Sequence, residues 1–266
     1  MVYIISKRQK SLESLVPNDD ALSEGNEAVN LTLATGTGYL TSATKSAATV
    51  TIIDNEPTPV GSTGNDLLIA TPGGKFDGQG NTIFTGDGND EVDLSTSSAA
   101  GGNRIDLGNG NDIIYVSIND IIFGGNGNDT FDATSGLGGN RMSGDAGNDI
   151  FYLGKGDRAL GGAGNDKFYV QSGGSNLLSG GAGNDQFWLA SGQLPDAPNT
   201  ILDFQIGTDV IGFAGSAGLG INATTIKLNQ VGNDTNILLG TQVLGVLSNT
   251  QSSQLNTANQ SQFVFA

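Results

Sequence analysis

The chain of 266 residues contains neither cysteine nor histidine. No disulfide can form, and catalytic or zinc sites that need a thiolate or an imidazole are excluded within this chain. Basic residues are also scarce, because 11 lysines and arginines stand against 27 aspartates and glutamates, for a formal net charge of −16. This balance argues against nucleic acid and anionic membrane surfaces as partners, and it permits the binding of metal cations.

Long hydrophobic runs are missing as well. No apolar stretch approaches the ~18 residues of a membrane-spanning helix, so we expect no insertion into a membrane. The first residues, MVYIISKRQKSLESL, place four apolar residues before the charges, which is not the order of a secretory signal. If the protein is exported, we expect its targeting signal to lie elsewhere in the chain.

Glycine is abundant, with 42 residues, and much of it falls in a repeated phrase that ends in Gly-Asn-Asp. The copies are GSTGND (61–66), GQGNT (78–82), TGDGND (85–90), LGNGND (107–112), GGNGND (124–129), GDAGND (144–149), GGAGND (161–166) and GGAGND (180–185). Three residues with an apolar middle one follow most copies: Val92, Ile114, Phe131, Phe151, Phe168 and Phe187. Each phrase predicts a tight glycine turn followed by a strand too short to be stable alone, which must pair with the next turn of a solenoid.

The phrase resembles the calcium-binding nonapeptide G-G-x-G-x-D-x-U-x of RTX (hemolysin-type) proteins, over about residues 60–190. The resemblance implies a parallel β-roll, a right-handed β-solenoid with two nonapeptides per turn, in which adjacent turns share each calcium ion. Successive aspartates would lie ~4.8 Å apart and repel each other, and Ca²⁺, which takes 6–8 oxygen ligands, would turn this repulsion into attraction. The predicted metal-site residues are Gly86, Gly88, Asp90, Gly108, Gly110, Asp112, Gly125, Gly127, Asp129, Gly147, Asp149, Gly162, Gly164, Asp166, Gly181, Gly183 and Asp185.

The spacing of the complete motifs predicts a one-sided roll. From Asp90 to Asp185 the motif aspartates are separated by 22, 17, 20, 17 and 19 residues, which is one whole turn each. They would therefore share one edge and form up to five calcium sites between them. The half-turns between them keep an inward residue but lose the Gly-x-Asp ending, so we expect little or no metal there. Arg104, Arg141 and Arg158 near these loops could replace calcium, and Asp66 is expected on this metal-poor edge.

The flanks differ from the repeats. Residues 19–56 resemble the C-terminal half of a Calx-β domain, with predicted strands at 28–34 and 48–53 and acidic residues that match its calcium positions loosely. After residue 192, alternating patterns predict strands on both sides of a Gly-Thr-Asp turn in 199–213, and further strands beyond. Asp203 and Asp209 could bind calcium or only form turns. The predicted organisation is a partial Calx-β-like segment (1–59), the roll (60–192), and a capping and secretion-signal region (193–266).

These observations predict an all-β protein: a parallel β-roll with a β-rich C-terminal cap and a short N-terminal sandwich-like fragment. We expect it to be secreted, non-enzymatic and dependent on several Ca²⁺ ions, with type I secretion machinery as a partner, as the family resemblance implies. Four alternatives stay open. The phrases could be simple turns, the solenoid could bind ice, or paired carboxylates could form a hydrolase. Finally, the chain could be the calcium-binding and secretion tail of a larger exoenzyme or adhesin.

Overall fold

The computed structural model describes residues 27–32, 47–52, 61–71, 76–95 and 101–266, and the chain divides into two units, Met1–Thr58 and Pro59–Ala266. In the first unit, β1 (Glu27–Thr32) pairs antiparallel with β2 (Ala47–Ile52). These are the two strands that the alternating pattern predicts. Most of the acidic residues matched to Calx-β, including Asp19, Asp20, Glu24, Asp54 and Glu56, lie outside the described residues.

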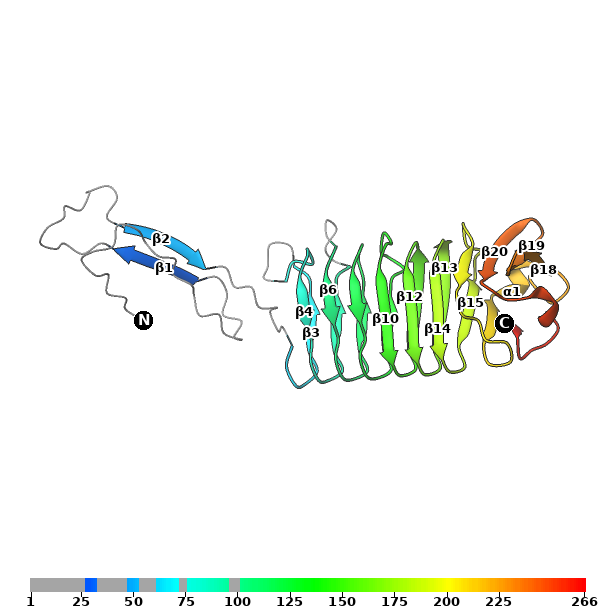
Figure 1. Cartoon of the computed structure of the whole chain (residues 1–266), viewed down its shortest axis with the longest axis horizontal. Helices are drawn as coiled ribbons and strands as arrows, with labels where there is room; N and C mark the ends of the chain where they lie inside the picture. The colour runs from blue at the N-terminus through cyan, green and yellow to red at the C-terminus, as the bar shows by residue number, and fades with distance from the viewer. Residues whose placement is uncertain (1–26, 33–46, 53–60, 72–75, 96–100) are drawn as a thin grey trace, which may run out of the picture. The chain divides into compact units, whose positions relative to one another are not determined.

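The second unit consists of two parallel sheets whose strands alternate along the chain (Figure 1). The motif sheet contains β3 (Leu67–Ile69), β5 (Glu91–Asp93), β7 (Ile113–Tyr115), β9 (Thr130–Asp132), β11 (Ile150–Lys155), β13 (Lys167–Gly174), β15 (Gln186–Ser191), β17 (Val210–Ala214) and β21 (Phe263–Phe265). The spacer sheet contains β4 (Thr82–Phe84), β6 (Arg104–Asp106), β8 (Ile121–Phe123), β10 (Arg141–Ala146), β12 (Arg158–Ala163), β14 (Leu177–Ala182), β16 (Asn199–Ile201) and β20 (Gln242–Leu247), followed by β19 (Asp234–Leu239) and β18 (Ile226–Val231). The described helical segments are α1 (Ser216–Leu219) and the 3₁₀ turn Ser252–Gln254, so the all-β solenoid is confirmed.

The core lies between the two sheets and is built from one side chain per short strand. Phe131, Phe151, Phe168 and Phe187 stack with ring centroids 4.6, 4.8 and 5.0 Å apart along the motif sheet. The spacer sheet supplies the facing residues, all buried: Ile105, Ile122, Met142, Ala159 and Leu178. Each of them lies in one of the half-turns that are predicted to keep an inward residue. Because each strand of the repeats hides only one or two large side chains, stability comes from stacking many coils rather than from any one of them.

The C-terminal segment continues the two sheets past residue 192. β16 pairs parallel with β14, and β17 pairs parallel with β15, so the predicted strands of 199–213 belong to different sheets and do not form a hairpin. Residues 202–209, between β16 and β17, form a corner of one further coil of the solenoid. β20 and β21 then add to the same two sheets, and β18, β19 and β20 form an antiparallel end to the spacer sheet.

Four apolar residues of this segment are buried: Ile201, Phe204, Ile211 and Phe213. Two others are less enclosed, because Ile206 is 38% exposed and Val210 is half-buried. Ile211 lies in register with Phe187, the last phenylalanine of the ladder. The segment therefore covers the end of the ladder, although the division at residue 192 stays a prediction and the sheets run across it.

Candidate metal centre

Six motif loops stack along one side of the roll, which we call the aspartate edge: the loops that end in Asp90, Asp112, Asp129, Asp149, Asp166 and Asp185. In each of the first five, the aspartate N–H donates to Oδ1 of the aspartate one turn further on, at 2.7–2.9 Å. All six carboxylates are buried, with exposed fractions of 0–2%. The loop sequence therefore places the predicted aspartates in a single column inside the protein.

The second oxygen of each carboxylate in this column has no hydrogen-bond partner. Oδ2 is buried and unpartnered in all six aspartates, in the part of the chain that the structure describes. A buried carboxylate oxygen without a donor is costly, and two or more such groups in a row add mutual repulsion. A cation would bind the unpartnered oxygens and reduce the repulsion between neighbouring carboxylates, so the column has the chemistry of a metal-binding edge.

Backbone carbonyls supply the further hard oxygens that calcium requires. Among the described residues, no donor reaches the carbonyl oxygen of the glycine two residues before the aspartate in any of these six loops: Gly88, Gly110, Gly127, Gly147, Gly164 and Gly183. By contrast, the carbonyls of Gly86 and Gly108, four residues before their aspartates, accept bonds from the next turn at 2.8 Å. No three carboxylates converge on one point within the described ranges. The donor set that the column offers thus combines carboxylates from successive turns with free carbonyls, which suits Ca²⁺.

Close stacking explains the glycines of the motif. A Cβ on Gly147 would collide with the carbonyl oxygen of Gly127 one turn earlier, and Gly147 has φ of +144°. Gly144 and Gly161, five residues before their aspartates, have a different role, because a Cβ there would collide with Oδ2 of Asp149 or Asp166. Because glycine has no side chain, these residues allow the turns to pack closely and leave room beside the unpartnered oxygen.

Burial changes the acidity of the column. Desolvation, opposed by the backbone N–H bonds and increased by neighbouring carboxylates, raises the pKa of Asp112 and of Asp149 to about 7. Desolvation likewise raises the pKa of Asp129, Asp166 and Asp185 to about 6. At neutral pH these carboxylates are poorly tolerated in the metal-free fold, so a bound cation would stabilise the folded state strongly.

The column continues at both ends, but its terminal carboxylates are satisfied by the protein. The N–H of Asp66 donates to Asp90 Oδ1 at 2.8 Å, so Asp66 belongs to the aspartate edge and its expected place on the other edge is wrong. Its own Oδ2 accepts bonds from the backbone N and the hydroxyl of Ser62, at 2.6 and 3.0 Å.

At the C-terminal end, Asp185 N–H donates to Asp209 Oδ1 at 3.1 Å, and Gln205 N–H donates to Asp209 Oδ2 at 2.7 Å. Asp203 accepts bonds from the Ser179 hydroxyl and from two glycine N–H groups of the last motif loop. Asp203 and Asp209 therefore finish the column with hydrogen bonds, which favours the turn role left open in the sequence.

The opposite edge carries a different column, which we call the asparagine edge: Asn81, Asn103, Asp120, Asn140, Asp157, Asn176 and Asn199. Each residue donates its backbone N–H to the side-chain oxygen of the next, at 2.8–3.2 Å. Sequence reasoning missed these asparagines, although Asn103, Asn140 and Asn176 each stand two residues before an inward residue, as Asp90 does before Val92.

The arginines near this edge do not replace a metal ion. Arg104, Arg141 and Arg158 are exposed at the start of β6, β10 and β12, and the Arg104 guanidinium lies 4.6 Å from the centre of the Phe123 ring. They lie on the outer surface of the spacer sheet and make no hydrogen bond to Asp120 or Asp157. The expectation that they occupy calcium positions is wrong, and the hydrogen-bond donors on this edge are backbone and asparagine amides.

The stacked loops, the buried aspartate column and the free carbonyls together define a metal-binding β-roll. Residues 98–193 match the RTX calcium-binding nonapeptide repeat family in four copies, at 98–117, 119–137, 134–167 and 172–193. These segments include five of the six motif aspartates, from Asp112 to Asp185. The match leaves the N-terminal unit uncovered, so the likeness to Calx-β has no support there.

No curated protein matches the chain. None of the helices within the described residues has the length and apolar character needed to cross a membrane.

Proposed function

We propose that the chain is a secreted, non-enzymatic calcium-binding β-roll, whose repeats fold when Ca²⁺ occupies the aspartate edge. The observation that carries this proposal is the row of six buried, unpartnered Oδ2 atoms. Six successive carboxylates define five gaps, so up to five ions would bind, each held by aspartates of two adjacent loops and by carbonyls of the glycines two residues before the aspartates.

Each residue of the motif has a separable part in this function. Oδ1 fixes the register of the coils through the N–H of the preceding turn, and Oδ2 is left for the cation. The glycines allow the turns to stack at close range. When bound, Ca²⁺ supplies the positive charge that neutralises the column, and its binding free energy becomes folding free energy.

Folding on binding also provides a reason for the protein to act outside the cell. Extracellular calcium modules typically have Kd of ~10⁻⁴–10⁻³ M, so such a chain would stay unfolded in a low-calcium cytosol and fold after export. Export through type I machinery and a C-terminal signal are the finer parts of this proposal. The clustered carboxylates are used by the repeats, which supports a non-enzymatic role.

A calcium titration followed by far-ultraviolet circular dichroism tests the proposal on the full chain. The strand signal should rise cooperatively with calcium and decrease in excess chelator. A strand-rich spectrum that excess chelator leaves unchanged would refute calcium-dependent folding.

A further inference from the structure

The two edges of the roll satisfy their buried side chains in different ways. On the asparagine edge, Asn103 Nδ2 donates to Asp120 Oδ1 at 2.8 Å and to the Gly78 carbonyl at 2.8 Å. Asn140 Nδ2 likewise donates to Asp157 Oδ1 at 3.0 Å and to the Ser117 carbonyl at 3.5 Å. One amide thus joins an oxygen of the next turn to a loop carbonyl of the preceding turn.

The same arrangement recurs further along the roll. Asn176 Nδ2 donates to Asn199 Oδ1 at 2.9 Å and to the Gly154 carbonyl at 3.2 Å. A side-chain oxygen and a loop carbonyl from different turns are the kinds of atom that a calcium ion would join on the aspartate edge. An amide nitrogen with two N–H donors can connect them without any ion.

We propose that Asn103, Asn140 and Asn176 act as built-in replacements for calcium, so that the asparagine edge holds its coils together without metal. The inference rests on the proposed function of the aspartate edge. It divides the roll into a side whose coils are joined without metal and a side whose order depends on calcium. The three asparagines are then the residues that determine which edge binds metal.

The carboxylates of the asparagine edge agree with this division. Asp120 and Asp157 are each separated from the next carboxylate by an asparagine, so no two charges are neighbours in the column. Asp120 Oδ2 accepts the Ser117 N–H at 3.0 Å, and among the described residues of this edge Asp157 Oδ2 is the only buried carboxylate oxygen without a partner, whereas Asn199 Nδ2 is a buried amide nitrogen without one. The neighbours of Asp157 in this column are the amides of Asn140 and Asn176. A cation beside Asp157 Oδ2 would therefore have only one carboxylate as a ligand, whereas each gap of the aspartate edge offers two.

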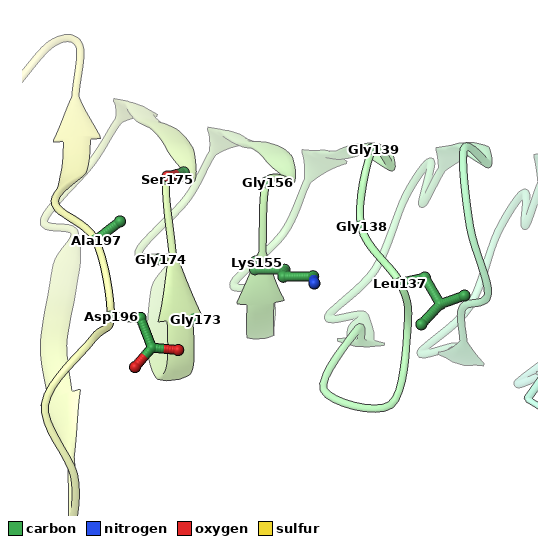
Figure 2. Close-up of a pocket in the computed structure, with 10 residues that line it drawn as sticks. All are labelled: Leu137, Gly138, Gly139, Lys155, Gly156, Gly173, Gly174, Ser175, Asp196 and Ala197. Atoms are coloured by element: carbon green, nitrogen blue, oxygen red, sulfur yellow. The ribbon is translucent and has the colours of Figure 1, made fainter.

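Side-chain cations do not provide an alternative explanation at these loops. Figure 2 shows the loops around Gly138, Gly156 and Gly174, which line an open cavity of about 350 Å³ on this edge. Lys155 is the only basic residue that lines it, and in this view its side chain extends towards Leu137, away from Asp196. The donors that join the turns are therefore the asparagine amides.

The substitution N140D tests the inference, because it creates three consecutive aspartates, Asp120, residue 140 and Asp157, with two gaps between them. We expect equilibrium dialysis against calcium to show about two more ions bound per full-length chain than in the wild type. In chelator, the variant should lose strand signal relative to the wild type. Exposed Asn229 in β18 offers a matched control, since N229D adds the same charge and should change neither quantity.

An N140D protein that folds with calcium and binds no more ions than the wild type would overturn the inference. If N140D does not fold at any calcium concentration, N176D, which places a carboxylate beside Asp157, gives the same measurement with about one added ion. Failure of the proposed function would give a different result, because the wild type would then bind no calcium. The number of ions that N140D or N176D binds beyond the wild type could still be measured in that case.

Discussion

Replacing Asp149 by asparagine should separate the structural role of this residue from its role in metal binding. The side-chain oxygen that remains can still accept the Asp129 N–H, which Asp149 Oδ1 accepts at 2.7 Å. The unpartnered Oδ2 becomes an amide nitrogen, as in Asn140 on the opposite edge. The variant D149N therefore removes one charge and one candidate metal ligand while it keeps the hydrogen bond that sets the register.

The magnitude follows from the position of Asp149 between Asp129 and Asp166, where it faces two gaps. With Kd of ~10⁻⁴–10⁻³ M, one ion contributes about 1.4–2.7 kcal/mol of stability at ~10 mM calcium. Losing two sites should lower the free energy of unfolding by about 3–5 kcal/mol at that concentration. In chelator the direction should reverse, because the variant no longer buries a carboxylate whose pKa burial raises to about 7.

Urea unfolding with and without calcium measures both effects on the full chain. D157N is the matched control, because Asp157 is also buried and has an unpartnered Oδ2, but lies on the asparagine edge. We expect D157N to leave the calcium-dependent part of the stability unchanged. Equal losses of calcium-dependent stability in D149N and D157N would refute the assignment of the metal to the aspartate edge.

Two further predictions concern pH and the C-terminal coils. In chelator, folded Asp112 and Asp149 keep their protons up to about pH 7, whereas the unfolded chain loses them near pH 3.8. The stability of the metal-free fold should therefore fall between about pH 4 and 7. Circular dichroism in chelator at pH 5 and pH 8 checks this, and equal strand signals would contradict it. Truncation after Pro198 removes β16 and β17, which pair with the strands that carry Leu178 and Phe187. Exposing these side chains should cost ~1.5–3 kcal/mol of stability for each of them. The truncated chain should need more calcium and fold less cooperatively, and an unchanged midpoint would argue against the capping role.

Local repetition explains how much of this structure could be predicted from the sequence. Each complete motif carries its own turn glycines, its aspartate and its inward residue, so the column from Asp90 to Asp185 and the ladder from Phe131 to Phe187 follow from spacing alone. Asp66 was misplaced because 24 residues separate it from Asp90, more than in any other turn of the motif series, and counting residues then gives the wrong phase.

The asparagine edge could not be predicted from the motif, because its residues occupy equivalent positions in successive coils but are not part of a repeated sequence. Asn103, Asn140 and Asn176 stand at the same offset from the inward residue as the motif aspartates, but different residues surround them. Likewise, alternating apolar residues predict β16 and β17, whereas only the pairing with β14 and β15 shows that they lie in different sheets. Pairing between distant turns is a property of the stacked coils and not of any single segment.

A crystal structure of the full chain grown with calcium, with anomalous scattering used to locate the ions, tests the central claim most directly. We predict a single row of ions, up to one in each gap between the loops from Asp90 to Asp185, and none beside Asn103, Asn140 or Asn176. Ions along both edges, or an aspartate edge without ions in a folded roll, would contradict it.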